Sequence, residues 1–332
     1  MTASRMRAVR IQDWGAPPVV ETIDAPHPGA GESLVRVEAA AVTHLDLTVA
    51  GGDFGFKPSL PYVGGTGGCG VVVESDELET GSRVLLRGGG LGLVRNGTWA
   101  EYVAAPNRHL TVLPDGMAAE VGATFFTPVS TAAAALRHAA RLGKWDLDGV
   151  SSPADEVIVV GGAAGAVGSM VTQLAMRAGA TVIGVVADAE QAAALPPGVE
   201  PVLSTDDERA GQLAEERPAS LLVDTLGGPG LGIRSRWVRT GGRAVAIGYV
   251  AGTDLTLDLP NWLLQDVALL PLNMIRRERQ ARELAAELTP LLLSGELRMD
   301  IERFAFEDAS RALELLGAGK LRGRPVLVPR ED

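Results

Sequence analysis

The chain has 332 residues, of which 46% are hydrophobic and 21% charged, and its formal net charge is −11. This length is enough for two domains with full cores. The negative charge argues against nucleic acid or an anionic membrane as the main partner, because both would repel the chain at long range. The apolar runs are too short to cross a bilayer, and no apolar segment follows the basic residues of the N-terminal MTASRMRAVRIQDWG. We therefore expect no membrane span, no secretory signal and a cytoplasmic protein.

Short strands separated by glycine and proline are predicted over the first 120 residues. Their apolar, β-branched composition is typical of antiparallel strands in a barrel-like unit. The predicted strands are Arg7–Ile11, Ser33–Ala41, Val71–Glu74, Arg83–Arg87 and Ala100–Ala104.

The pattern changes after Val121 to an alanine-rich helix and then to strands that alternate with helices. Such alternation indicates an α/β fold with a parallel, doubly wound sheet, so a second domain is expected to begin near residue 123. The predicted elements, in chain order, are Val157–Val160, Gly168–Ala178, Val182–Val186, Leu221–Asp224, Leu231–Val238 and Arg243–Ile247.

A glycine-rich turn, GGAAGAVGS from Gly161 to Ser169, lies between a predicted strand and a predicted helix. This arrangement is typical of a dinucleotide-binding turn. Ala163 stands where the first glycine of the fingerprint is usual, Gly165 allows the backbone to approach a pyrophosphate, and Gly168 lets the helix lie close to the strand. The helix N-terminus presents free N–H groups to the phosphates. An ordinary tight turn is the alternative. The candidate cofactor-binding residues here are Ala164, Gly165, Ala166, Val167 and Gly168.

Metal chemistry is restricted by the single cysteine, Cys69, and by four widely separated histidines. One cysteine allows no intramolecular disulfide and no multi-cysteine zinc cluster. No pair of histidines has a metal-ligand spacing. Each histidine is therefore expected to be a surface or turn residue rather than a ligand.

Nine segments spread over nearly the whole chain resemble the zinc-independent medium-chain dehydrogenase/reductases, in the branch of the quinone oxidoreductases and 2-enoyl reductases. The resemblance implies a GroES-like β-barrel catalytic domain formed by residues 1–122 and 267–332, with a Rossmann nucleotide-binding domain, residues 123–266, inserted into it. The matching segments begin at Ala39 (AAAVTHLDLTVAGG), Leu60 (LPYVGGTGGCGVV), Thr80 (TGSRVL), Gly97 (GTWAEYVAAPNRHLTVLPDGM), Ser130 (STAAAAL), Gly161 (GGAAGAVGS), Val223 (VDTLGG), Gly241 (GGRAVAIG) and Phe306 (FEDASRALELLGAGKLRGRPVLV).

The resemblance also implies which reaction to expect. In the zinc-dependent alcohol dehydrogenases a cysteine would fall at Thr43 and a histidine at Thr66, and a hydroxyl replaces thiolate or imidazole poorly. Without a metal to polarise an alcohol, alcohol oxidation is disfavoured. We therefore expect an NAD(P)H-dependent reductase that transfers hydride to a quinone or an α,β-unsaturated carbonyl compound.

Three residues are candidates for the catalytic site by the same resemblance: Thr43, Asp46 and Thr131. Thr48 stands where many reductases carry a tyrosine, so the usual acid is missing. Asp46 has an alternative role in bracing the turn after Val42, and Thr131 has one as a helix cap. We expect the proton to come from solvent or from a hydroxyl beside the substrate.

The choice of cofactor depends on the end of the second Rossmann strand. Val186 occupies the position where an acid usually binds the ribose 2′-OH of NAD, and Asp188 lies two residues further. Family resemblance puts NADPH ahead of NADH, although Ala187, Gln191 and Thr205 stand where NADP-specific members carry basic and hydroxyl groups. Arg177 and Arg209 are the candidates to approach a 2′-phosphate, with solvation at the surface as the alternative.

The rest of the cofactor site is assigned to later loops at Leu226, Gly248, Tyr249 and Asn273. The resemblance further implies a homodimer that acts on a small-molecule substrate. The alternative is a non-redox binding protein that keeps the fold after losing its catalytic groups, and the departures at Thr43, Thr48, Ala163 and Gln191 favour it.

Overall fold

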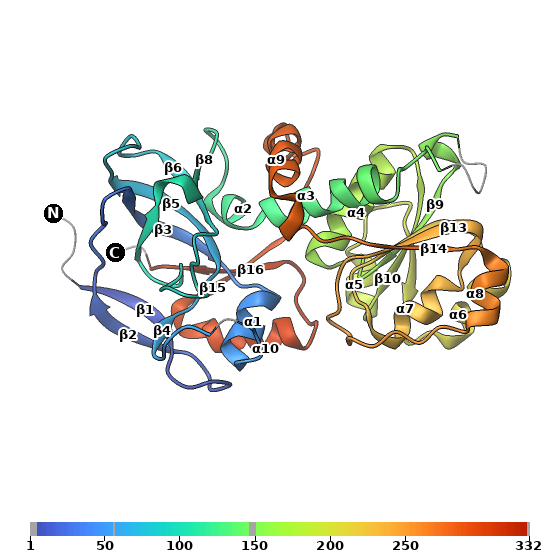
Figure 1. Cartoon of the computed structure of the whole chain (residues 1–332), viewed down its shortest axis with the longest axis horizontal. Coiled ribbons are helices and arrows are strands. Elements are labelled where there is room, and N and C mark those ends of the chain that lie inside the picture. Colours follow the sequence, from blue (N-terminus) through green and yellow to red (C-terminus); the bar gives the residue numbers. More distant parts are fainter. Residues whose placement is uncertain (1–4, 56, 146–150, 331–332) are drawn as a thin grey trace. The chain divides into compact units, whose positions relative to one another are not determined.

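The computed structural model describes residues 5–55, 57–145 and 151–330. These residues form two compact units (Figure 1). Unit 1 consists of Met1–Phe125 and Asp300–Asp332, and unit 2 consists of Phe126–Met299. In the described part of the chain, no helix is long and apolar enough to cross a membrane.

Unit 1 is built from two β-sheets. One has the strand order β2-β1-β4, and the other has the order β15-β16-β3-β5-β6-β8 with β7 paired to β3. All pairs are antiparallel except β15 with β16. The strands are β1 (Arg5–Ile11), β2 (Val19–Asp24), β3 (Glu32–Ala41), β4 (Tyr62–Val63), β5 (Gly67–Glu74), β6 (Arg83–Arg87), β7 (Tyr102–Pro106), β8 (Leu110–Val112), β15 (Ile301–Ala305) and β16 (Arg324–Val328).

Three α-helices accompany the sheets of unit 1 in its described residues: α1 (His44–Gly51), α2 (Ala119–Thr124) and α10 (Ala309–Gly317). The core between them contains alternating strand residues and two large rings, Trp99 and Phe306. Trp99 is fully packed, and its indole N–H donates to the Ala41 carbonyl at 2.9 Å. A buried indole therefore keeps its hydrogen bond while it fills the core.

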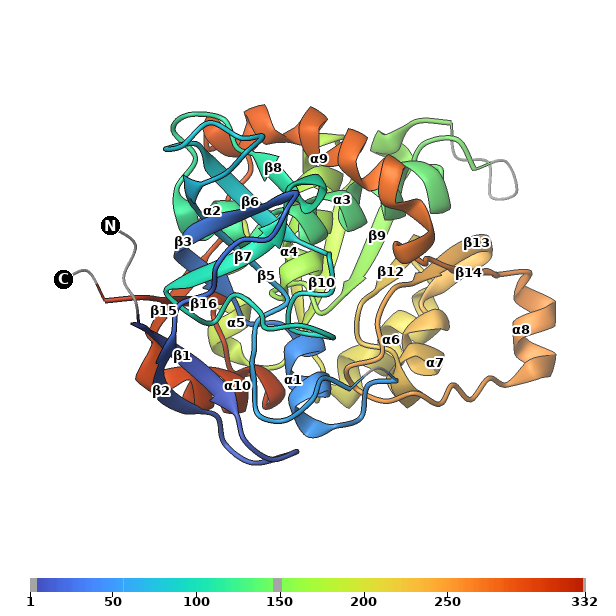
Figure 2. The same ribbon diagram turned by 60° about the vertical axis from the view of Figure 1, so that its left-hand side comes forward.

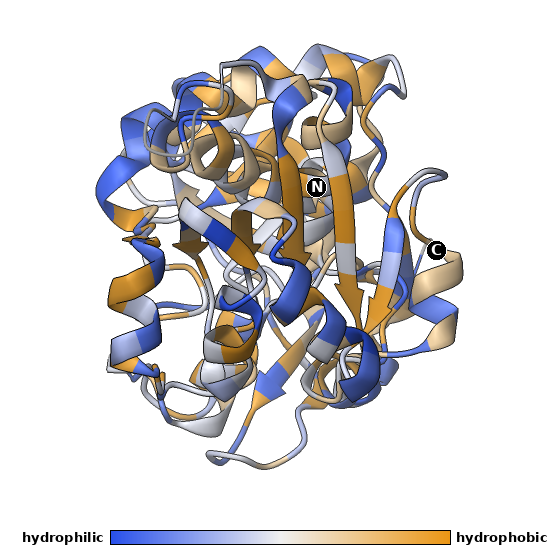
Figure 3. Ribbon diagram, turned by 90° about the vertical axis from the view of Figure 1, so that its right-hand side faces the viewer, coloured by the Kyte–Doolittle hydropathy of each residue, from blue (hydrophilic) through white to orange (hydrophobic). Residues whose placement is uncertain are grey.

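Unit 2 contains a six-stranded sheet with the order β11-β10-β9-β12-β13-β14, and all neighbouring strands are parallel. Numbered from β9, this is the order 3-2-1-4-5-6 of doubly wound dinucleotide-binding folds. The strands are mostly orange in Figure 3, as expected for a sheet covered on both faces. They are β9 (Val157–Gly161), β10 (Thr181–Val186), β11 (Glu200–Leu203), β12 (Ala219–Asp224), β13 (Val238–Ala246) and β14 (Ala268–Pro271).

The helices of unit 2 connect these strands by crossovers. α4 packs on β9, β10 and β12, whereas α7 packs on β12, β13 and α6. Right-handed crossovers put α4 and α7 on opposite faces of the sheet. The α-helices are α3 (Phe126–Ala134), α4 (Ala166–Arg177), α5 (Ala189–Ala193), α6 (Asp207–Glu216), α7 (Gly228–Ser235), α8 (Leu259–Gln265) and α9 (Glu278–Leu293).

The second junction between the units differs from the predicted boundary at residues 266 and 267. The chain after Val267 continues as β14, which pairs with β13 in the parallel sheet. It then forms α9, which packs along α3 (Figure 2). The return to unit 1 therefore comes only at Asp300, because a sixth strand and a long helix complete unit 2 first.

A buried ion pair stabilises the interior of unit 2. Both side chains, Glu156 and Arg243, are completely buried. The Arg243 guanidinium donates to both carboxylate oxygens, at 2.9 and 2.5 Å, and to the Ala140 carbonyl at 2.8 Å. The Ser220 hydroxyl and the Gly143 N–H also donate to this carboxylate, at 2.5 and 2.9 Å. Each charge in this pair is thus compensated by direct hydrogen bonds.

Candidate functional site

Most of the predicted cofactor residues lie just after the carboxyl ends of the parallel strands in unit 2. Because all six strands are parallel, their carboxyl ends lie at one edge of the sheet. The direction in which successive strands are added to the sheet reverses between β9 and β12. Ligands of such sheets bind at that point. The predicted residues follow β9 (Ala164 to Gly168), β10 (Asp188), β12 (Leu226), β13 (Gly248 and Tyr249) and β14 (Asn273).

The glycine turn after β9 has the geometry of an anion cradle. Gly162 adopts a positive φ of 76°, and its carbonyl accepts from the Gly165 N–H at 2.9 Å. A Cβ atom on Gly168 would overlap the Gly162 carbonyl, so only glycine lets α4 start this close to the strand. No side chain among the described residues caps α4 at Gly165. The free N–H groups of the first turn, with the positive end of the helix dipole, fit a pyrophosphate.

The loop after β12 is held by a buried acid, Asp224, whose structural role was not predicted from the sequence. Asp224 accepts from the N–H groups of Leu226 and Gly227 at 3.1 and 2.7 Å, and from Arg234 Nε at 2.6 Å. Both side chains of this ion pair are almost fully buried. Asp224 therefore fixes the backbone that carries Leu226 at the cofactor edge. An aspartate at the end of a continuous apolar strand was the signal in the sequence.

The end of β10 carries Asp188, which is the N-cap of α5. Its Oδ1 accepts from the Gln191 N–H at 2.9 Å. The same end lies against the glycine turn, because the Val185 carbonyl accepts from the Gly162 and Ala163 N–H groups at 3.1 and 2.9 Å. Asp188 and the predicted pyrophosphate cradle are therefore neighbours at this edge of unit 2.

The two arginines expected near a 2′-phosphate are paired elsewhere. Arg177, at the end of α4, pairs with Glu296 at 2.5 Å. Arg209 donates to Glu200 from Nε and Nη2, at 3.0 and 2.7 Å. Glu200 is the first residue of β11, so the Arg209 guanidinium points to the amino edge of the sheet, away from Asp188. The expectation that either arginine approaches a 2′-phosphate is not supported by these contacts.

The later cofactor candidates lie in loops at the carboxyl edge with different exposure. Gly248 follows β13, and a Cβ atom there would overlap the Thr225 carbonyl, so the loops after β12 and β13 touch through this glycine. Tyr249 is 72% exposed. The Asn273 side chain accepts from the Ile275 N–H at 3.0 Å and so shapes the turn after β14.

The predicted catalytic residues Thr43 and Asp46 are in direct contact in unit 1. Thr43 is the N-cap of α1 and forms a capping box with Asp46. Asp46 Oδ2 accepts from the Thr43 N–H at 2.8 Å and from the Thr43 hydroxyl at 2.6 Å, while Oδ1 accepts from the Thr66 N–H at 2.8 Å. Asp46 is 3% exposed. The expected bracing of the turn after Val42 is thus present, and it leaves the threonine hydroxyl oriented by a carboxylate.

Burial shifts the pKa values of several groups around Asp46, and nearby charges modify these shifts. Burial raises the pKa of Asp46, although hydrogen bonds from Thr43 and Thr66 oppose this effect. Burial lowers the pKa of Arg324 to about 10, and the charge of Asp46 partly opposes it. Burial and the nearby Arg324 lower the pKa of His44. Arg324 Nε is buried without a hydrogen-bond partner in the described residues. Neither His44 nor Arg324 could be placed near Asp46 from the sequence, because their proximity results from the return of β16 to unit 1.

Thr131, the third predicted catalytic residue, lies in unit 2. It is buried within α3, five residues after the helix begins, so the alternative role as a helix cap is wrong. Its place near the nicotinamide stays a prediction.

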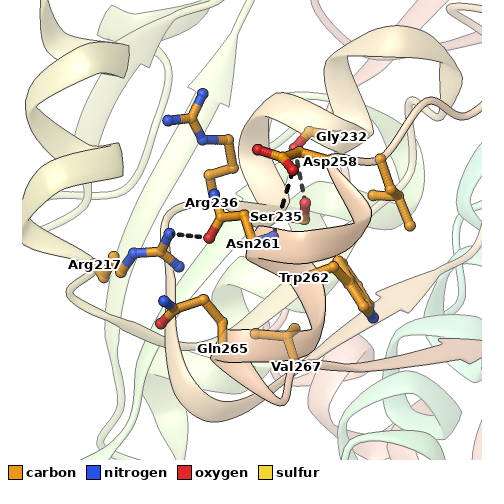
Figure 4. A pocket seen from close by; sticks show the side chains of 10 residues that line it. Arg217, Gly232, Ser235, Arg236, Asp258, Asn261, Trp262, Gln265 and Val267 are labelled. Atoms are coloured by element: carbon orange, nitrogen blue, oxygen red, sulfur yellow. Dashed lines mark hydrogen bonds between the residues drawn. The ribbon is translucent and has the colours of Figure 1, made fainter.

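A separate small pocket in unit 2 lies between α6, α7 and α8 (Figure 4). Its volume of about 30 Å³ is enough for water only. Arg217 Nη2 donates to Asn261 Oδ1 across it at 3.0 Å, and burial together with Arg236 lowers the pKa of Arg217. Arg217 and Gln265 come just before β12 and β14, at the amino edge of the sheet. This pocket is therefore not part of the predicted cofactor site.

The residues present do not fit a zinc site of the alcohol dehydrogenase kind. Among the described residues, no group of three or more histidine, cysteine, aspartate and glutamate side chains could hold a metal ion. Thr43 and Thr66 stand where a zinc-dependent alcohol dehydrogenase would carry a cysteine and a histidine. Both contact Asp46 through their backbone N–H groups. Two neutral hydroxyl groups and one carboxylate are a poor donor set for Zn²⁺.

Two family models match the chain, and together they span more than half of it. The Alcohol dehydrogenase GroES-like domain matches residues 29–115, and the Zinc-binding dehydrogenase model matches residues 166–289. An alcohol dehydrogenase from Geobacillus stearothermophilus is 25% identical over 370 residues, covering 98% of this chain and 100% of that protein. A quinone oxidoreductase from Pongo abelii is 30% identical over 186 residues, which are 54% of this chain and 52% of that protein.

Solved structures agree with these relatives. A mycobacterial protein solved in complex with NADPH is 25% identical and has a TM-score of 0.81, with 98% of this chain and 100% of that chain covered. The chain belongs to the medium-chain dehydrogenase/reductases, in the quinone oxidoreductase branch. It is an NAD(P)H-dependent oxidoreductase with a GroES-like domain and a Rossmann domain, which confirms the predicted fold class and enzyme class.

Proposed function

We propose that this oxidoreductase reduces a quinone or an α,β-unsaturated carbonyl compound with a nicotinamide cofactor and without zinc. The observation that carries the proposal is the uncapped start of α4 behind the Gly162 to Gly168 turn, at the point where the strand order reverses. This arrangement supports binding of a pyrophosphate, and hence of a dinucleotide. Quinone oxidoreductases among the relatives support the substrate class.

The donor set around Thr43 and Thr66 supports a reaction that needs no metal. When bound, a reduced nicotinamide supplies a hydride, which a quinone or an enone accepts because the added charge delocalises onto oxygen. A proton must then reach the substrate. The Thr43 hydroxyl, held at 2.6 Å by Asp46, is the group in unit 1 that we assign to position a proton, with solvent as its source. By resemblance, Thr131 is assigned to the nicotinamide end.

Thr43 and Asp46 are tested by their effect on turnover. We expect Thr43→Ala and Asp46→Ala to lower kcat, while Thr43→Ser keeps the hydroxyl and most of the activity. The measurement is steady-state oxidation of the reduced cofactor with a fixed quinone. If both alanine variants turn over as fast as the wild type, neither residue takes part in the mechanism.

A homodimer formed through the edge of the unit 2 sheet is part of the proposal. Among the described residues, β14 pairs only with β13, so its outer edge has free backbone groups. The helix that precedes it, α8, exposes Leu263 and Leu264 by 68% and 78%. A second copy of the chain would cover both features.

The dimer is tested by light scattering after gel filtration. Leu263→Asp is expected to convert the dimer to a monomer. Val94→Asp changes another exposed apolar side chain, in unit 1, and is the matched control that should leave the mass unchanged. A monomeric wild type would contradict the dimer and leave the proposed reaction untouched.

The reaction itself is tested by titrating the purified protein with NADPH and with NADH, following nicotinamide fluorescence, and then adding a panel of quinones and enones. Turnover that persists after treatment with a metal chelator is expected. Binding of neither cofactor would overturn the proposed function, and loss of activity on chelation would overturn its metal independence.

A further inference from the structure

We infer that the enzyme uses NADH in preference to NADPH, and that Asp188 is the residue that sets this preference. The inference rests on the proposed function, because it assigns the cofactor of the same site. It departs from the expectation based on family resemblance, and the charges at the carboxyl edge of β10 and β11 carry it.

The place of the adenosine ribose follows from the geometry of unit 2. The end of β10 is hydrogen-bonded to the glycine turn through the Val185 carbonyl. A dinucleotide whose pyrophosphate lies on the start of α4 places its adenosine ribose over the end of the second strand, which here is β10. The first polar side chain after β10 is Asp188, and it is exposed.

The chain segment that forms the carboxyl ends of β10 and β11 carries negative charge only. From residue 178 to residue 208 the sequence contains no lysine, arginine or histidine. This stretch includes β10, α5, β11 and the start of α6. Within it, five acids follow the carboxyl ends of β10 and β11: Asp188, Glu190, Asp206, Asp207 and Glu208. The ends of these two strands are neighbours, since the Ser204 N–H donates to the Val186 carbonyl at 2.8 Å.

The arginines that flank this stretch are held at the other edge of the sheet. Arg209 contacts Glu200 at the start of β11, and its Nη1 also lies 3.4 Å from Glu216. Arg177 ends α4, which begins at the carboxyl edge and runs back toward the amino edge, and there it pairs with Glu296. To reach a 2′-phosphate, each arginine would have to break an existing ion pair.

The two cofactors differ at the ribose 2′ position, where NADH has a hydroxyl and NADPH has a phosphate. Asp188 uses Oδ1 to cap α5, and Oδ2 has no partner among the described residues. A carboxylate oxygen accepts a hydrogen bond from a hydroxyl, whereas it repels a phosphate that carries a charge of about −1.5 to −2. The same side chain therefore favours one cofactor and disfavours the other.

The experiment measures the dissociation constants of NADH and NADPH for the purified full chain by nicotinamide fluorescence. We expect NADH to bind at least about tenfold more tightly, as repulsion between a phosphate and nearby carboxylates near a protein surface implies. Because salt screens this repulsion, raising the ionic strength should tighten NADPH binding relative to NADH binding.

Asp188→Asn is the variant that tests the residue, because asparagine also caps helices and keeps the shape of the side chain. It should strengthen NADPH binding and weaken NADH binding, each by several-fold. Glu215→Gln removes the same charge near the end of α6, at the amino edge, and is the matched control that should leave the ratio unchanged. Asp188→Ser combined with Gln191→Lys should reverse the preference.

The binding results distinguish failure of the inference from failure of the proposed function. Preferential binding of NADH that Asp188→Asn reduces supports the inference. Equal or tighter binding of NADPH, or an unchanged ratio in Asp188→Asn, overturns the inference while the proposed reductase stands. Binding of neither cofactor overturns the proposed function and the inference with it.

Discussion

Two buried carboxylates, Asp46 in unit 1 and Glu156 in unit 2, show how different partners set the charge of an acid. Burial raises the pKa of Asp46, and its partners are neutral N–H and hydroxyl groups of Thr43 and Thr66. Burial acts on Glu156 in the same direction, but hydrogen bonds from Arg243, Ser220 and Gly143 outweigh it and hold the pKa below its usual value.

The difference has a functional meaning. A buried acid without a bonded cation has a raised pKa and takes up a proton more readily than a salt-bridged acid, which suits a group that orients a reactive hydroxyl. A buried acid chelated by a guanidinium stays charged and holds its elements together. The comparison therefore separates a carboxylate assigned to the chemistry from one assigned to the fold.

The largest effect is expected from breaking the ion pair of unit 2. Arg243→Met leaves the Glu156 charge buried without its partner, which costs about 3–5 kcal/mol of unfolding free energy. Urea unfolding measures the loss. Glu156→Gln combined with Arg243→Met removes both charges and should recover much of the stability. A single variant as stable as the wild type would show that the pair contributes nothing.

A smaller loss is expected in unit 1. Asp46→Ala leaves the N–H groups of Thr43 and Thr66 without their acceptor, and buried unsatisfied donors cost about 1–3 kcal/mol each. The same urea experiment measures it. Thr48→Ala is the control and should change stability little, because it removes a hydroxyl that donates to the His44 carbonyl in the same helix. Equal losses in the two variants would contradict the capping role of Asp46.

The pH dependence of stability should have opposite signs for the two acids. Glu156, with a lowered pKa, stabilises the fold above its ordinary value of 4.5, and this contribution is lost as the pH falls through its folded pKa. Asp46, with a raised pKa, contributes below its ordinary value of 3.8, and this contribution is lost as the pH rises through its folded pKa.

Unfolding free energies between about pH 4 and pH 7 test these signs. The advantage of the wild type over the Glu156→Gln, Arg243→Met double variant should grow toward neutral pH. Its advantage over Asp46→Ala should shrink over the same range. Parallel slopes would show that the two acids titrate alike.

The smallest effect is expected from an exposed ion pair of unit 2. Arg137 donates to both carboxylate oxygens of Glu287, at 2.7 and 2.8 Å, and both side chains are about half exposed. Solvent screens such pairs, so Glu287→Gln should cost at most about 1 kcal/mol. Urea unfolding beside Arg243→Met compares an exposed pair formed by one guanidinium nitrogen with a buried pair formed by two. A loss in Glu287→Gln as large as that in Arg243→Met would contradict the weak contribution expected of an exposed pair.

Much of the fold was predictable because its signals are local. The predicted strands Arg83–Arg87 and Val157–Val160 coincide with β6 and nearly with β9, since an apolar run between turn residues needs no distant partner to be recognised. β11 and β14 were missed because each has only four residues, too few for a clear periodicity. Each is defined by pairing with the neighbouring strand of the sheet.

The candidate site also combines features set by local sequence with features set by tertiary packing. The sequence by itself determined the glycine turn, the residues at the strand ends and the contact between Thr43 and Asp46, because these features lie within a few residues of each other. Only the tertiary structure decided the partners of Arg177 and Arg209, the position of Arg324 near Asp46, and the buried pair of Asp224 with Arg234. A long charged side chain can pair with any of several groups that are distant in sequence. Which of these groups lies within its reach is fixed only after the strands and helices have packed.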